Sequence, residues 1–71
     1  MLDPYQLRIF LTAAETLNFS RAADNLHMSQ PSVTQHIKQL ESHFEAPLFV
    51  RTGNRLALSD AGHTLVAMAR D

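Results

Sequence analysis

The chain has 71 residues, of which 45% are hydrophobic and 18% are charged, and this size and composition predict one small folded domain. No apolar run approaches the roughly 20 residues that cross a bilayer, the first residues lack the pattern of a secretory signal, and the absence of cysteine excludes disulfides and thiolate zinc sites. The formal net charge of −1 lacks the basic excess typical of phosphate binding, although a total averages over the faces of a molecule. We therefore expect a soluble cytoplasmic domain that does not contact a membrane.

The first predicted element is a helix that begins at Asp3 and Pro4. Asp3 is a good N-cap acceptor, and proline is tolerated at the first helical position because its missing N–H would be unpaired there. Apolar residues then recur at spacings of three and four, and they predict a stripe that faces the core: Leu7, Phe10, Leu11, Ala14 and Leu17. The helix is expected to run to about Asn18.

A second, short helix is predicted after Phe19, with Ser20 as its N-cap and an end near His27. Its apolar residues Ala22, Ala23 and Leu26 are mostly small, which allows neighbouring helices to approach closely. A break follows at residues 28–29. Ser29 or Gln30 is then expected to cap a third helix that carries Pro31 in its first turn.

The third helix is predicted from Gln30 to Phe44 and has two distinct faces. Its apolar residues lie at i, i+4, i+7 and i+11, which at about 100° per residue form one narrow inward stripe: Val33, Ile37, Leu40 and Phe44. The opposite face and its flanks are rich in amides and hydroxyls: Gln30, Pro31, Ser32, Thr34, Gln35, Lys38, Gln39 and Ser42. Such side chains can pair with base edges in the major groove of duplex DNA, and the N-terminal half of such a helix usually enters the groove.

Each of these polar residues, taken alone, is typical of a solvated helix surface. The joint pattern carries more weight: two short helices, a break of a few residues, and an amphipathic helix with proline in its first turn. This pattern is typical of a helix-turn-helix in which the third helix reads DNA.

A hairpin is predicted after the third helix. Residues 48–50 and 56–58 are β-prone, and residues 51–55 between them have turn chemistry, with Gly53 and Asn54 suited to positive φ. Arg51 and Arg55 flank this turn and would meet the DNA backbone or the minor groove. For Arg51, an ion pair with Glu41 is an equally good alternative. The fold class expected is therefore mainly α, a three-helix core with a two-stranded wing.

A last helix is predicted after Ser59, which is a good N-cap. It carries one apolar line of Ala61, Leu65 and Met68 and a second of Gly62, Val66 and Ala69, more than so small a domain is expected to cover. We expect residues 1–58 to form the winged domain and residues 59–71 to begin a longer linker helix that pairs with a second copy. Its predicted dimer contacts are Ala61, Leu65, Val66, Met68 and Ala69.

Other functions receive less support. No Gly-rich phosphate loop or clustered set of catalytic groups is present, so an enzyme is not expected. His36 and His43 share a helical face but lie seven residues apart, about 10.5 Å, too far to share a metal ion. No metal or cofactor is therefore expected in this domain, and His36 is expected at the surface. The main alternative is a winged-helix adaptor that binds only proteins, which would favour an apolar or acidic outer face on the third helix.

Residues 10–41 read F-x-x-A-A-E-x-x-N-F-S-R-A-A-x-x-L-x-M-S-Q-P-S-V-T-Q-H-I-K-Q-L-E, and P-L-F-V-R and L-S-D-A-G follow. This sequence resembles the N-terminal domain of LysR-type transcriptional regulators over nearly its whole length. The resemblance implies a DNA operator, a homodimer often assembled into a tetramer, RNA polymerase as a further partner, and a small-molecule inducer bound by a C-terminal effector-binding domain absent from this chain. It also implies DNA contacts by Gln30, Pro31, Ser32, Thr34, Gln35, Lys38, Arg51, Asn54 and Arg55.

The sequence departs from the family pattern at three places. Thr34 stands where serine is commoner, and Gln35 lies at a position that varies between arginine, glutamine and histidine. After the third helix, Glu45 and Ala46 replace a usual glycine. Because a left-handed cap without glycine costs roughly 1 kcal/mol or more, the third helix is expected to end differently or to run slightly longer.

Overall fold

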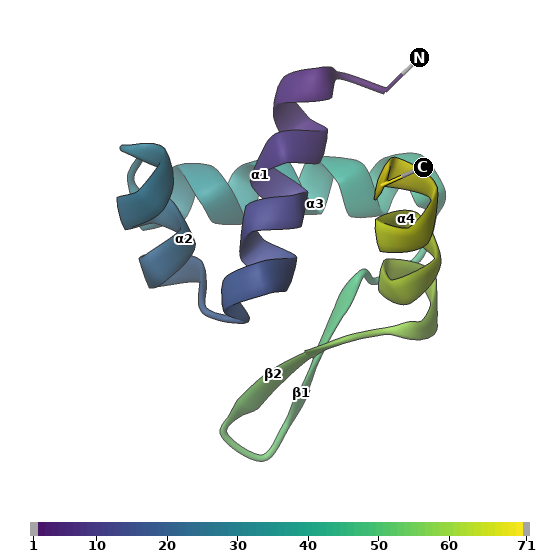
Figure 1. Ribbon diagram of the computed structural model, residues 1–71. Coiled ribbons are helices and arrows are strands. Elements are labelled where there is room, and N and C mark those ends of the chain that lie inside the picture. The colour runs from purple at the N-terminus through teal and green to yellow at the C-terminus, as the bar shows by residue number, and fades with distance from the viewer. Residues whose placement is uncertain (1, 71) are drawn as a thin grey trace.

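The computed structural model describes residues 2–70 and has four helices and one two-stranded antiparallel sheet. In chain order the elements are α1 (Pro4–Thr16), α2 (Phe19–Leu26), α3 (Gln30–Phe44), β1 (Phe49–Thr52), β2 (Arg55–Leu58) and α4 (Asp60–Arg70). In Figure 1, α1 crosses α3, α2 and α4 lie toward opposite ends of α3, and the hairpin extends away from the helices. The predicted architecture, mainly α with a three-helix core and a two-stranded wing, is confirmed. Within residues 2–70, none of the helices has the length and apolar character that a membrane span requires.

Side-chain caps begin the helices, largely where the sequence predicts. The Asp3 carboxylate accepts a hydrogen bond from the Tyr5 N–H at 2.9 Å, and Ser29 accepts one from the Ser32 N–H at 3.2 Å. The predicted Ser20 cap of α2 is wrong, because Asn18 accepts from the Arg21 N–H at 3.0 Å. Asparagine and serine are both good N-caps. Because Asn18 is the cap, α2 begins at Phe19.

The ends of α1, α2 and α3 share a feature that is unusual for residues other than glycine. Leu17, His27 and Glu45 all have φ between 49° and 56°, in the left-handed region. After α3, the N–H of Ala46 donates to the Glu41 carbonyl and the N–H of Glu45 to the Ser42 carbonyl, which is the Schellman pattern. The expectation that α3 avoids a left-handed cap is therefore wrong, because these hydrogen bonds stabilise the turn despite its steric cost.

Glu45→Gly is consequently expected to raise the free energy of unfolding by about 0.5–1 kcal/mol. Glycine removes the left-handed strain of about 1–2 kcal/mol but adds freedom to the unfolded chain. Urea denaturation measures the change. Ser42→Gly is the matched control in the same helix and is expected to lower stability by a similar amount, since it introduces glycine at a helical φ. Equal destabilisation by both variants would contradict the interpretation.

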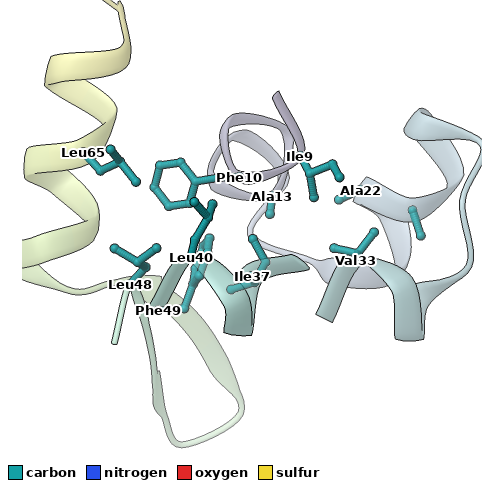
Figure 2. Close-up of a cluster of buried hydrophobic side chains, with 11 residues drawn as sticks. Ile9, Phe10, Ala13, Ala22, Val33, Ile37, Leu40, Leu48, Phe49 and Leu65 are labelled. Carbon is teal, nitrogen blue, oxygen red and sulfur yellow. The ribbon is translucent and has the colours of Figure 1, made fainter. Parts of the chain in front are cut away.

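The core lies where α1 crosses α3. Figure 2 shows its side chains, which come from every helix and from the base of the hairpin: Ile9, Phe10, Ala13, Ala22, Ala23, Val33, Ile37, Leu40, Leu48, Phe49 and Leu65. The predicted inner stripe of α3 is confirmed, with Phe44 half-buried at its end. Phe49 ties the hairpin to two helices, since its ring lies 5.6 Å from that of Phe10 and 5.2 Å from that of Phe19.

The stripe predicted for α1 is only partly correct. Phe10 is buried, but the other fully buried positions are Ile9 and Ala13, and Leu17 is 42% exposed. The physical reason is that α1 packs against α2, α3 and α4, so its buried surface is set by three neighbours. The spacing of apolar residues predicts one narrow buried stripe, which would be correct only for a helix that packs against a single neighbouring element.

The hairpin has a tighter turn than the five residues expected from its composition. Phe49 pairs with Leu58 and Thr52 with Arg55, so only residues 53 and 54 lie in the turn. Gly53 has φ of +64°, whereas Asn54 does not adopt a positive φ, which corrects the expectation for Asn54. A positive φ at the first central residue alone fits a type II′ turn, whose twist matches that of the strands. Arg51 and Arg55 therefore lie within the strands.

Candidate nucleic-acid interface

The outward face of α3 forms an open groove whose lining residues are mostly of polar types. It has a volume of about 450 Å³ and is lined by Gln30, Pro31, Thr34, Gln35 and Lys38, all of them predicted DNA contacts. Gln30 donates a hydrogen bond from its amide nitrogen to the Thr34 hydroxyl at 2.7 Å. The Ser32 hydroxyl accepts one from the Ser29 hydroxyl at 2.9 Å and lies beside the groove, not in its lining. The groove therefore presents amide and hydroxyl groups and one cation.

A second hollow connects α3 to the wing. It has a volume of about 220 Å³ and is lined by Leu17, Asn18, Phe19, Ser20, Gln30, Arg51, Asn54 and Leu56. Gln30 lines both hollows, so the predicted wing residues Arg51 and Asn54 lie next to the N-terminal end of α3. Arg55 is exposed at the start of β2 and lines neither hollow. Six of the nine predicted residues thus lie on α3, Arg51 and Asn54 line the hollow beside its N-terminal end, and Arg55 lies apart from both hollows on the wing.

The charge around these two hollows favours an anion. Among the residues that line them, Lys38 and Arg51 are the charged ones, and both are cationic. Glu41 is the alternative ion-pair partner that the sequence suggests for Arg51. In the structure its carboxylate accepts a hydrogen bond from the Leu48 N–H at 2.8 Å. Arg51 lines the same hollow as Asn18 and Ser20. The net charge of −1 therefore does not describe this face.

Asn18 and Ser20 are residues of this face that the sequence-based prediction did not include. Both lie at the start of α2, where the loss of regular hydrogen bonding leaves backbone N–H groups free. A signal was present in the sequence, because two good capping residues on either side of Phe19 mark a helix start, where anions can bind. Their position relative to Arg51 depends on long-range packing and could not be inferred.

His36 occupies a different environment from the one predicted. Its Nδ1 lies 3.0 Å from the amide nitrogen of Gln6, and its ring meets that of Tyr5 edge to face at 5.6 Å. Gln6 also donates to the Gln39 side chain, so the start of α1 contacts one flank of α3. His36 is therefore half-buried against α1 and does not lie free at the surface. Within residues 2–70, no three His, Cys, Asp or Glu side chains are grouped so as to hold a metal ion.

The apolar residues of α4 do not all face outward. Gly62 is buried, and Leu65 is only 4% exposed and belongs to the core. Met68 is 63% exposed and lines two apolar hollows, one with Phe44, Ala46 and Leu48 and one with Leu2, Leu7 and Ala69. Ala61, Val66 and Ala69 are half-buried. Of the five predicted dimer contacts, Leu65 is thus the least exposed, although it lines both of these hollows, and the other four are more accessible.

Comparison with known proteins supports this geometry. Residues 4–63 match the family model of bacterial regulatory helix-turn-helix proteins of the lysR family. The transcriptional activator AllS of Klebsiella pneumoniae is 44% identical over 71 residues, which are 100% of this chain and 26% of that protein. The chain spans about a quarter of the length of the curated relatives it matches.

Solved structures of lysR-family proteins share this fold and a substantial part of its sequence. A crystal structure of a LysR-family transcriptional regulator from Eggerthella lenta has a TM-score of 0.94 and 41% identity, with 100% of both chains covered. A CbnR DBD–DNA complex has a TM-score of 0.89 and 35% identity, covering 97% of this chain and 79% of that one. The curated relatives include proteins that are named as transcriptional regulators, such as AllS of Klebsiella pneumoniae and CitR of Bacillus subtilis. The chain belongs to the lysR family of bacterial regulatory helix-turn-helix proteins.

Proposed function

We propose that this domain binds double-stranded DNA in a sequence-specific manner as part of a transcription regulator. In this proposal the first two turns of α3 enter the major groove, where Gln30, Pro31, Ser32, Thr34, Gln35 and Lys38 contact base edges and the nearby backbone. The wing residues Arg51, Asn54 and Arg55 contact phosphates or the minor groove. The α3 groove supplies base readout, and the cations supply affinity without sequence information.

The observation that carries the proposal is the continuity of the two hollows. Gln30 joins the groove of α3 to the hollow beside Arg51, so one exposed surface holds amides, hydroxyls and cations, and no carboxylate lines either part of it. The absence of carboxylates from this lining suits DNA better than the acidic face that a protein-binding adaptor would favour. The structural relative that was solved on DNA has the same fold at 35% identity, which adds independent support.

The proposed functional unit is a dimer or higher oligomer. A net charge of −1 and a single recognition helix give one domain modest affinity, and a two-fold dimer would bind two half-sites. We propose that residues 59–71 start a linker helix whose apolar side chains contact a second copy: Ala61, Leu65, Val66, Met68 and Ala69.

The wider context is also proposed. The relatives are about four times as long as this chain, which leaves room for the effector-binding domain and its small-molecule inducer. An operator near a promoter, RNA polymerase as a further partner and a cytoplasmic location would follow from the role of a transcription regulator.

The proposal is tested by duplex binding at several salt concentrations and by selection of bound DNA from a random pool. Release of counterions predicts that affinity falls as salt rises, with a slope set by the number of phosphate contacts. Selection is expected to return a paired half-site. Affinity that stays flat with salt, or a selected pool without any shared motif, would reject sequence-specific DNA binding.

Arg55→Ala is expected to weaken binding to most duplex sequences alike and to reduce the salt slope by about one. The reason is that Arg55 is exposed on the wing and lies outside the α3 groove. Gln35→Ala is the matched comparison from within the groove, and it is expected to relax base preference with little change in the slope. An Arg55 variant that changed only base preference would contradict the assignment of this residue to the backbone.

A further inference from the structure

Glu41 connects the recognition helix to the base of the wing. It lies on α3, one turn before the helix ends, and its carboxylate accepts a hydrogen bond from the Leu48 N–H at 2.8 Å. Leu48 is the residue immediately before β1, and its side chain is fully buried. A charged acceptor in a half-buried setting makes a stronger hydrogen bond than a neutral one.

The other side of the same segment is held by Ser59. The Ser59 hydroxyl donates to the Pro47 carbonyl at 2.6 Å, and the Ser59 N–H donates to the Leu48 carbonyl at 3.0 Å. Both polar groups of the Leu48 backbone are therefore satisfied, the N–H by α3 and the carbonyl by the residue that joins β2 to α4. The two strands leave from this point, since Phe49 pairs with Leu58.

This arrangement gives Glu41 a role that Ser59 does not have. Ser59 and Leu48 both belong to the part of the chain that carries the wing, so their hydrogen bonds hold the hairpin together at its base. Glu41 belongs to α3, so its hydrogen bond fixes where the wing begins relative to the helix that carries the proposed reading groove. Without the carboxylate, the half-buried Leu48 N–H would lose its partner, and the segment would shift to find another.

We propose that Glu41 is a positioning residue that sets the wing relative to α3 and so makes the DNA contacts of the wing possible. This inference rests on the proposed function, because it assigns the wing to DNA. It does not place Glu41 on the DNA. Its effect is expected to pass through Arg55, the predicted contact that lies on the wing outside both hollows.

The first test needs no DNA. The chain has no cysteine, so spin labels at Ser42→Cys on α3 and Thr52→Cys on the wing report a single distance. Glu41→Ala is expected to broaden that distance distribution, and Glu41→Gln, which keeps an uncharged acceptor, to broaden it less. Glu15→Ala removes the same charge from an exposed position on α1 and is expected to leave the distribution unchanged. If Glu41→Ala does not fold, Glu41→Gln decides, and an unchanged distribution in the deciding variant overturns the proposal.

The second test is a double-mutant cycle on duplex affinity. Glu41→Ala, corrected by Glu15→Ala for the lost negative charge, is expected to weaken binding about fivefold when Arg55 is present. The loss is expected to be less than twofold when Arg55→Ala is already in place. Equal losses in the two backgrounds would show that the effect of Glu41 does not pass through Arg55 and would overturn the proposal.

The two proposals fail in different ways. If the parent protein does not bind duplex DNA, or if Arg55→Ala binds as tightly as the parent, the proposed function fails and the spin-label distances still decide the role of Glu41. If the parent binds and Arg55 matters, but the cycle is additive, the positioning role alone is wrong.

Discussion

Gly62→Ala is expected to lower the free energy of unfolding by about 3 kcal/mol, at the upper end of overpacking substitutions. A Cβ built on Gly62 would lie 2.2 Å from the Leu48 carbonyl oxygen and 2.8 Å from a methyl group of Leu58. The first of these contacts is with backbone, so no rotamer change relieves it. The start of α4 would have to move away from the base of the wing.

The cost extends beyond the clash because the same place is held by hydrogen bonds. Ser59 accepts from the Gly62 N–H at 3.0 Å and donates to the Pro47 carbonyl, so moving α4 weakens both bonds. Urea denaturation and thermal unfolding measure the loss. A change of about 3 kcal/mol corresponds to a fall in Tm of more than about 10 °C in a domain of this size.

Gly53→Ala is the matched control. Gly53 has φ of +64° and open space around it, so alanine meets left-handed strain but no clash. The expected loss is about 1 kcal/mol. If Gly53→Ala cost as much as Gly62→Ala, conformational strain and not the close approach of α4 would explain the glycine requirement.

Met68→Glu is expected to have the largest effect on DNA binding, although Met68 lies far along the chain from the reading groove. Met68 is 63% exposed between two apolar hollows, and in the proposed dimer it would be covered by the second copy. A two-fold axis brings both copies of the new carboxylate into one interface, where burial of an unpaired charge is unfavourable.

The expected result is a folded monomer. Sedimentation measures the oligomeric state, and affinity for a duplex with two half-sites is expected to fall about 100-fold, since linked binding of two modules commonly contributes that much. Affinity for a single half-site is expected to remain unchanged. These measurements require a longer form of the regulator, in which α4 continues into the complete proposed linker helix.

Ala67→Glu is the control on the same helix. Ala67 is exposed and lines neither apolar hollow, so the added charge is expected to stay in water and leave the oligomeric state unchanged. Dissociation by both variants would indicate a general effect of charge on α4. Retention of the dimer by Met68→Glu would exclude Met68 from the interface.

The candidate site shows how far sequence reasoning reaches. The amphipathic period of α3 separated Val33 and Ile37 from Gln35 and Lys38 correctly, because one helix of 15 residues fixes the direction of every side chain along it. The partner of Glu41 was not predictable in the same way. From the sequence, the Glu41 carboxylate could pair either with Arg51 or with the Leu48 N–H, since both follow it closely in the chain. The path of residues 45–48 places the Leu48 N–H against the carboxylate.

The sequence alone determined the features that depend on a few consecutive residues. Asp3, Ser29 and Ser59 cap helices because the acceptor and the N–H it binds lie two or three positions apart. Only the tertiary structure decided the features that require distant segments to meet: the buried face of α1 and the glycine at position 62. The physical reason is that steric fit and desolvation act between neighbours in space, and Gly62 meets Leu48 only after the chain between them has formed the wing.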